Sequence, residues 1–133
     1  MLSLAQLHEI AKARLDDAEV LFSALRFDGA AYLCGYAIEV TLKAQVCKTL
    51  QWAEFPEKSN EFRSLGLQSF KTHDLDVLLR LSGREAYIKT NLFAEWSAVS
   101  QWNPEGRYQP VGAVSEQVAK QMIEAAKMFA SAP

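Results

Sequence analysis

The feature that most constrains the fold is the segment from Ala30 to about Leu50, which contains no proline and has a helical period. A segment of this length and spacing predicts a long helix that is mostly buried. Before it, Ser3 and Gln6 have the spacing of a capping box, and apolar residues then recur at helical spacing up to about residue 26. Asp28-Gly29 is expected to form the turn and the N-cap between the two helices. Because this connection is short, we predict an antiparallel helical hairpin about 30 Å long.

The rest of the chain predicts shorter helices joined by loops. Residues 51–71 contain Pro56 and Gly66 among several aromatic residues, which favours a packed loop with room for a helical turn. Further helices are expected over about 73–82 with Thr72 as cap, over about 88–99, and from a cap at Ser115 onward, with a loop over 101–114. No alternating β-branched run competes with them. The sequence therefore predicts an all-α fold, an up-and-down bundle of four to five helices with more than about 60% helix and no sheet.

Composition limits the size and the environment of the protein. A chain of 133 residues is expected to form a single domain over residues 1–133. No apolar stretch approaches the roughly 20 residues that span a bilayer, and the first residues lack the features of a signal peptide. We therefore expect no membrane segment and a cytoplasmic location. Because 50% of the residues are hydrophobic and several loop residues are aromatic, we also expect a homodimer.

The net charge and the few potential metal ligands limit the functions that the chain can have. The chain has 14 Lys and Arg against 16 Asp and Glu, a net charge of −2, so nucleic-acid binding would need a local basic patch. Cys34 and Cys47 are expected to be buried thiols. His8 and His73 are the only histidines and lack the spacing of a zinc site, so neither a metal nor a cofactor is expected.

A polar stripe runs along the long predicted helix. At 100° per residue, four residues lie within about 40° of one another: Tyr32, Tyr36, Glu39 and Lys43. Apolar residues flank the stripe, so Glu39 and Lys43 are predicted to point inward. Inward charges need partners, and these two have the spacing that allows them to pair with each other.

Two more residues, Glu95 and Arg107, are predicted to lie near the charged residues of the polar stripe. Glu95 is predicted to point inward, on the face of its helix that holds Leu92 and Val99. Arg107, in the 101–114 loop, is expected to reach Glu39 or Glu95 with paired hydrogen bonds. Two interpretations stay open: a buried ion-pair network that fixes the loop, or a ligand-binding or catalytic cleft.

If a cleft exists, the ligand site is expected where the polar stripe meets His73 and the loop. Aromatic faces would stack a base, while the cations would bind phosphate. The candidate ligand-binding residues are Tyr32, Tyr36, Glu39, Lys43, His73 and Arg107, and His73 is the candidate catalytic residue.

The same residues resemble a known family. The segment Tyr32-Leu33-Cys34-Gly35-Tyr36-Ala37-Ile38-Glu39-Val40-Thr41-Leu42-Lys43-Ala44, followed by Thr72-His73-Asp74-Leu75 and by Leu78-Leu79, resembles the HEPN domain (higher eukaryotes and prokaryotes nucleotide-binding). The match covers about residues 5–100, and the segment Trp102–Tyr108 resembles the end of one HEPN subgroup. The resemblance implies an up-and-down helical bundle that commonly dimerises. It also implies a function as a ribonuclease, a toxin, or an accessory domain paired with a minimal nucleotidyltransferase.

Ribonuclease members of that family carry an Arg followed by a His after four to six residues on a late helix. This chain has no such pair, and the nearest approach is Arg63 and His73 with nine residues between them. We therefore expect first a nucleotide- or RNA-binding or accessory domain, with a nucleotidyltransferase partner in a toxin-antitoxin-type system. The alternatives are a metal-independent endoribonuclease acting at a dimer cleft through His73, Arg107 and Glu39, and a purely structural interaction module.

Overall fold

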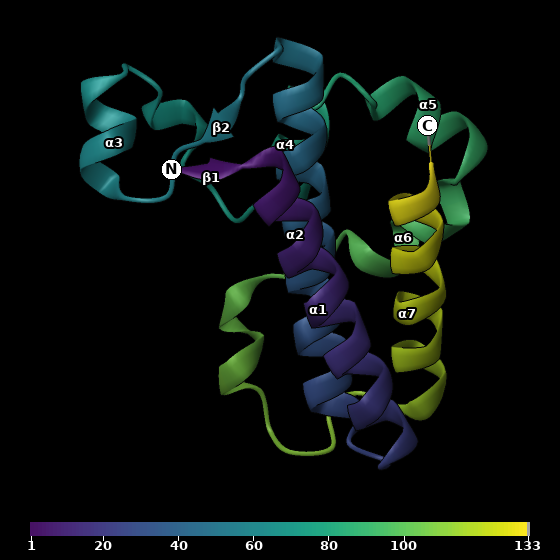
Figure 1. Ribbon diagram of the computed structural model, residues 1–133. Coiled ribbons are helices and arrows are strands. Elements are labelled where there is room, and N and C mark those ends of the chain that lie inside the picture. Colours follow the sequence, from purple (N-terminus) through teal and green to yellow (C-terminus); the bar gives the residue numbers. More distant parts are fainter. Residues whose placement is uncertain (133) are drawn as a thin grey trace.

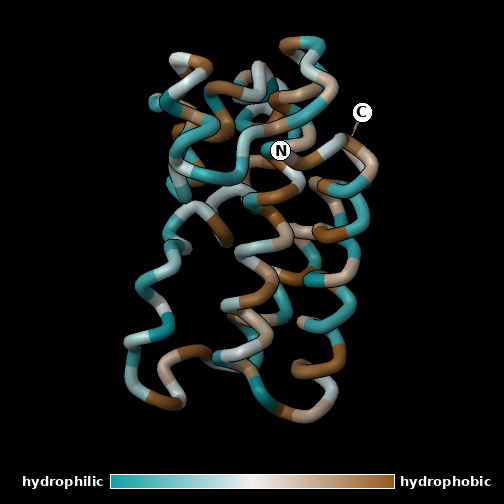
Figure 2. Tube along the Cα trace, turned by 60° about the vertical axis from the view of Figure 1, so that its left-hand side comes forward, coloured by the Kyte–Doolittle hydropathy of each residue, from teal (hydrophilic) through white to brown (hydrophobic). Residues whose placement is uncertain are grey.

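Three long helices form the body of the molecule, as a computed structural model describes it for residues 1–132 (Figure 1). Helices α1 (Leu4–Ser23) and α2 (Phe27–Leu50) run antiparallel, and α7 (Glu116–Ser131) packs against both. Polar and apolar residues interchange along these helices (Figure 2), as expected for helices that bury one side. The described residues are 72% helical, which confirms the predicted all-α class.

The remaining elements are short. They are β1 (Leu2–Ser3), β2 (Glu54–Phe55), α3 (Ser59–Ser64), η1 (Gln68–Phe70), α4 (Leu75–Leu81), α5 (Glu85–Asn91), α6 (Phe93–Val99) and η2 (Pro104–Tyr108), where η marks a 3-10 helix. Residues 1–132 thus contain seven α-helices, more than the four to five predicted. The 51–71 segment is the predicted packed loop with helical turns: it contains α3 and η1, and Trp52 packs against Phe55 and Phe70 with ring centroids 6.0 and 4.9 Å away.

The prediction of no sheet was wrong in one place. β1 and β2 pair antiparallel, with Leu2 opposite Phe55 and Ser3 opposite Glu54. Strands of two residues are too short to produce an alternating pattern in the sequence. Phe55 is 1% exposed and belongs to a small core at this end of α2, which is separate from the larger core shared by the long helices. Burial of this ring therefore holds the short strands in place.

The turn between α1 and α2 lies earlier than predicted. Ser3 and Gln6 form the predicted capping box at the start of α1. The chain then reverses at Leu25, which has a φ of 63°, and α2 begins at Phe27. Asp28 therefore lies inside α2 rather than in a turn, and its carboxylate accepts hydrogen bonds from the backbone N–H groups of Gly112 and Val114, at 2.7 and 2.9 Å. These bonds hold the loop that precedes α7 against the start of α2.

Two further helix boundaries differ from the prediction. Helix α4 starts after Asp74 instead of Thr72, because the Asp74 carboxylate accepts from the N–H groups of Asp76 and Val77. The helix predicted over 88–99 is divided into α5 and α6 at Leu92, where φ is −131°. Residues 90–91, Thr and Asn, are weak helix formers, so the sequence does not favour continuation there. At the last helix, the predicted Ser115 cap is confirmed.

Two further findings concern membranes and thiols. Within residues 1–132 no helix combines the length and the apolarity needed to cross a bilayer.

Cys34 and Cys47 are free and buried, as predicted. Burial raises the pKa of Cys34 to about 12, so this thiol is protonated at neutral pH and is a poor nucleophile.

Candidate functional site

Glu39 is the centre of a charged cluster on α2. Its side chain is 4% exposed, and each of its two oxygens has one cationic or potentially cationic partner. Lys43 Nζ donates to Oε2 at 3.1 Å, and His73 Nδ1 lies 2.8 Å from Oε1. The predicted inward orientation of Glu39 and its pairing with Lys43 are confirmed. We call Glu39, Lys43 and His73 the Glu39 cluster.

Two neighbouring elements hold the partners of Glu39 in place. Lys43 Nζ also lies 5.6 Å from the ring centroid of Phe55 in β2, a cation–π distance. His73 directly precedes α4, and the Asp74 cap fixes the backbone at that point. Because Nδ1 is bound to the buried carboxylate, Nε2 is the ring nitrogen left for proton transfer. The His73 side chain is 60% exposed, so a ligand has access to it.

An aromatic group continues the polar stripe toward the start of α2. The Tyr32 and Tyr36 hydroxyls are 3.3 Å apart, and Trp102 packs edge-on against Tyr36 with ring centroids 4.9 Å apart. Trp102 lies directly on Gly35, where a Cβ would stand 2.1 Å from the indole. The hydrogen bond with Tyr32, and next burial, raise the pKa of Tyr36 to about 12. Tyr36 is therefore a neutral hydrogen-bonding group at physiological pH.

Arg107 does not make the predicted bonds. Its guanidinium is exposed, donates to the carbonyl of Pro104 at 3.0 Å and stacks on Tyr108, with 4.6 Å between the guanidinium carbon and the ring centroid. Neither Glu39 nor Glu95 is its partner, because the η2 turn folds the side chain back on its own loop. The neighbouring hydroxyls of Tyr108, and next Tyr32, raise the pKa of Arg107, so it keeps its charge. Arg107 therefore joins the aromatic end of the stripe rather than the Glu39 cluster.

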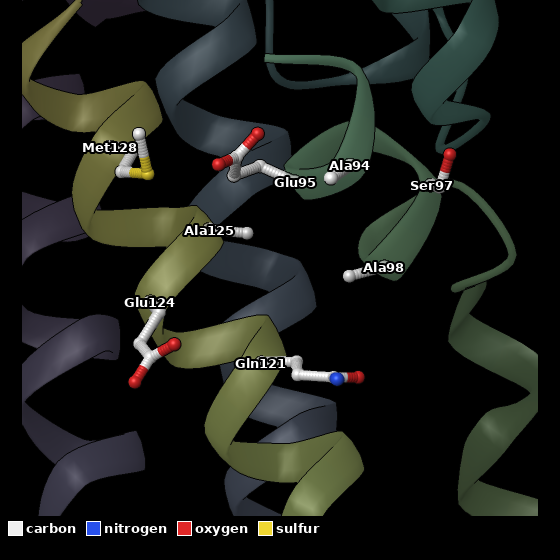
Figure 3. Close-up of a pocket in the computed structure, with 8 residues that line it drawn as sticks. All are labelled: Ala94, Glu95, Ser97, Ala98, Gln121, Glu124, Ala125 and Met128. Atoms are coloured by element: carbon white, nitrogen blue, oxygen red, sulfur yellow. The ribbon is translucent and has the colours of Figure 1, made fainter.

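The inward orientation predicted for Glu95 was also wrong. It is half-exposed at the rim of a groove between α6 and α7, into which it projects beside Met128 and Ala125 (Figure 3). The helical phase used for the prediction assumed one helix over 88–99, and the break at Leu92 changes that phase. This groove of about 450 Å³ is the largest cavity described, and it contains none of the six candidate ligand-binding residues.

Two smaller cavities lie beside the aromatic end of the stripe. One, of about 220 Å³, is lined by Tyr32 on α2, by residues of the 101–114 loop and by α7. The other, of about 340 Å³, is an open cleft in front of His73. Gln101, Trp102 and Asn103 line both cavities. The sequence prediction did not assign these three residues a role, although they begin the loop in which Arg107 was singled out.

The site therefore combines cations, aromatic rings and an imidazole bound to a carboxylate. Within residues 1–132, no three His, Cys, Asp or Glu side chains are grouped so as to hold a metal ion. Comparison with known proteins found that no family model, no curated protein and no solved structure matches this chain.

Proposed function

We propose that the chain is a nucleotide- or RNA-binding domain of HEPN type that engages its ligand along the polar stripe of α2. Three pairs of side chains support this proposal: Arg107 stacked on Tyr108, Tyr32 with its hydroxyl 3.3 Å from that of Tyr36, and Glu39 paired with Lys43. Tyr108 is 73% exposed and carries a guanidinium on its face, which suits base stacking beside phosphate contacts. Because the net charge is −2, affinity has to come from these few local groups and falls as salt is added.

Binding of labelled oligo(U) and oligo(A), followed by fluorescence anisotropy at low salt, tests the proposal. Arg107→Ala is expected to weaken binding by roughly fivefold or more, because it removes one phosphate contact and one stacking partner. Arg63→Ala is the matched control, since Arg63 is also an exposed arginine and lies on α3, away from the stripe. Equal losses in the two variants, or no binding by the parent protein, would refute the proposal.

A second function, metal-independent cleavage of RNA, is favoured by one specific observation: the Glu39–His73 pair. A buried carboxylate bound to Nδ1 orients the imidazole and leaves Nε2 as the proton acceptor, the arrangement of a general base. In this reaction Nε2 takes the proton of a ribose 2′-hydroxyl, O2′ attacks the adjacent phosphorus, and the bond from phosphorus to O5′ breaks. The leaving oxygen takes a proton from water, and the hydroxide so formed takes the proton from Nε2, which gives a 2′,3′-cyclic phosphate and a 5′-hydroxyl and restores the imidazole.

Incubation of mixed-sequence RNA with the protein and excess EDTA separates this second function from binding alone. Cleavage that is lost in His73→Gln and kept in His8→Gln supports it, because His8 lies on the exposed side of α1. No cleavage by the parent protein leaves the binding domain as the proposed function.

We also propose a homodimer and a nucleotidyltransferase partner of the toxin-antitoxin type for this domain. Several large apolar side chains are exposed, among them Phe93 at 64%, Val20 at 69% and Leu25 at 70%. A surface of this kind is more typical of a protein with an interface than of a monomer. Sedimentation at micromolar concentration measures the assembly directly, and a mass near the 14.9 kDa of one chain would contradict the dimer.

A further inference from the structure

The cavity of about 220 Å³ under the 101–114 loop has the size and the lining of a base-binding pocket. It is smaller than the roughly 300–1,000 Å³ of pockets that enclose a whole drug-sized ligand. The cavity therefore suits one planar ring system and not a complete nucleotide.

The charges around the cavity indicate that a phosphate does not enter it. None of the described residues that line it is Arg or Lys, and the only charged side chain is Asp28. Both Asp28 oxygens accept backbone hydrogen bonds from the loop. Apolar and aromatic residues supply most of the remaining wall, with Tyr32 from α2, Trp102 from the start of the loop and Met122 from α7. A neutral aromatic group is the ligand that these walls accept.

We propose that this cavity binds the adenine base of an adenosine unit, with the ribose in the open cleft at His73; the inference rests on the proposed function and names its ligand. Gln101, Asn103 and Gln109 bring three carboxamides to the rim. A carboxamide offers one donor and one acceptor side by side, which matches N6 and N7 of adenine. At the same edge guanine presents two acceptors, O6 and N7, which call for Arg or Lys, and the described lining has neither.

The ribose is placed by the neighbouring cleft. Gln101, Trp102 and Asn103 line both cavities, so the two adjoin, and the sugar of a base bound in the first would lie in the cleft with His73, Asp74 and Asp76. Oδ1 of Asp74 caps α4, and Oδ1 of Asp76 accepts from Trp96 Nε1 at 3.2 Å. The second oxygen of each carboxylate has no donor among residues 1–132, and carboxylates bind ribose hydroxyls. The site is therefore expected to prefer ribose to deoxyribose.

Titration calorimetry with nucleosides tests the base and the sugar without any phosphate contribution. Adenosine is expected to bind at least about tenfold more tightly than guanosine and cytidine, and about tenfold more tightly than 2′-deoxyadenosine. Equal affinity for the three ribonucleosides, or no binding of adenosine, would overturn the inference.

Gly106 provides a matched pair of variants at the cavity wall. Its φ is not positive, and a Cβ would meet only Tyr32, at 3.9 Å, so larger residues are accommodated without backbone strain. Gly106→Ala is expected to bind adenosine within about twofold of the parent, and Gly106→Leu to lose binding because it takes up cavity space. Circular dichroism checks the fold of both.

If Gly106→Leu is unfolded, Gln109→Ala replaces it and is expected to reduce the preference for adenosine over guanosine at least threefold. Unchanged adenosine binding in a folded Gly106→Leu, or an unchanged preference in Gln109→Ala, would also overturn the inference.

The same samples separate failure of this inference from failure of the proposed function. Oligo(U) that binds through Arg107 while adenosine does not bind refutes the adenosine pocket and leaves RNA binding intact. Adenosine that binds while oligo(A) and oligo(U) do not bind supports the pocket and refutes RNA binding.

Discussion

The polar stripe of α2 and the groove between α6 and α7 both present glutamates next to apolar residues, but the two regions handle charge in opposite ways. On α2, the Glu39 side chain is 4% exposed, and its two oxygens are bound by Lys43 and His73. In the groove, Glu95 is half-exposed and has no ion pair within the part of the chain described. Water solvates Glu95, so it needs no protein partner.

The difference follows from what covers each helix. α2 contacts α1, α7, α4, β2 and η2, so little of its surface reaches solvent. A carboxylate there costs several kcal/mol unless it is paired. α6 has seven residues and packs on α7 and α5, and the groove between α6 and α7 is open to solvent. The glutamate on the covered helix α2 is therefore expected to contribute to the stability of the fold, and the glutamate on the open helix α6 is not. Substitutions in the two regions test this contrast.

The largest effect is expected for Glu39→Ala. Removal of a buried carboxylate leaves the Lys43 ammonium without its partner in a mostly apolar setting, and we expect a loss of about 3 kcal/mol in the free energy of unfolding. Urea denaturation followed by circular dichroism measures this loss. A change below about 1 kcal/mol would place Glu39 in the same category as Glu95 and remove the contrast between the regions.

Gly35→Ala comes next, with an expected loss of about 2 kcal/mol from overpacking. The added methyl would stand 2.1 Å from the Trp102 indole and would displace it from α2. Gly29→Ala is the control on the same helix, because its Cβ meets only the end of the flexible Leu21 side chain, at 3.3 Å. Since alanine favours helix over glycine by roughly 1 kcal/mol, a stabilised Gly35→Ala would contradict the close packing of the loop on α2.

A smaller, pH-dependent effect is expected for Asp28→Asn. The backbone N–H of Gly112, and next that of Val114, lower the pKa of Asp28 below its ordinary value of 3.8. The carboxylate therefore contributes stability that is fully present above pH 3.8 and is lost as the pH falls through the lower folded-state pKa. Urea unfolding of both proteins between pH 2 and pH 7 should show a gap that closes on the acid side. A gap that stays constant with pH would exclude the ionised carboxylate as its source.

The smallest effect is expected for Glu95→Ala, within about 0.5 kcal/mol of the parent protein at neutral pH. The side chain is half-exposed and makes no hydrogen bond or ion pair within residues 1–132. The urea midpoint and slope should both match those of the parent. A loss above about 1 kcal/mol would mean that the groove is covered in solution, which an assembled form of the protein would explain.

The orientation of side chains could be predicted from the sequence where they all lie on one uninterrupted helix. The positions of Tyr32, Tyr36, Glu39 and Lys43 on one side of α2 follow from helical geometry alone, and the cost of a buried charge then predicted the Glu39–Lys43 pair. The expectation that the stripe meets His73 is confirmed by the 2.8 Å contact with Glu39.

Side-chain orientations could not be predicted from the sequence where they depend on a helix break or on how a loop folds. The break at Leu92 invalidated the orientation predicted for Glu95, and the η2 turn directed Arg107 toward Tyr108 instead of a glutamate. The cavity under the loop depends on the bonds between Asp28 and the N–H groups of Gly112 and Val114, which connect distant parts of the chain. No periodicity within one segment encodes such contacts.

The bonds from Asp28 to the loop also determine when the site is completed during folding. α1 and α2 are joined by a few residues and share the most extensive helix contact in the molecule, so their pairing requires little loop closure. Asp28 and Gly112, by contrast, are 84 positions apart. We therefore expect a folding sequence in which the hairpin forms early and the loop closes over α2 late. Pulsed hydrogen exchange should protect amides in the middle of α2 before those of Gly112 and Val114. In a nascent chain, the face of α2 that carries Tyr32, Tyr36 and Glu39 would then stay uncovered until the last third of the sequence has been synthesised.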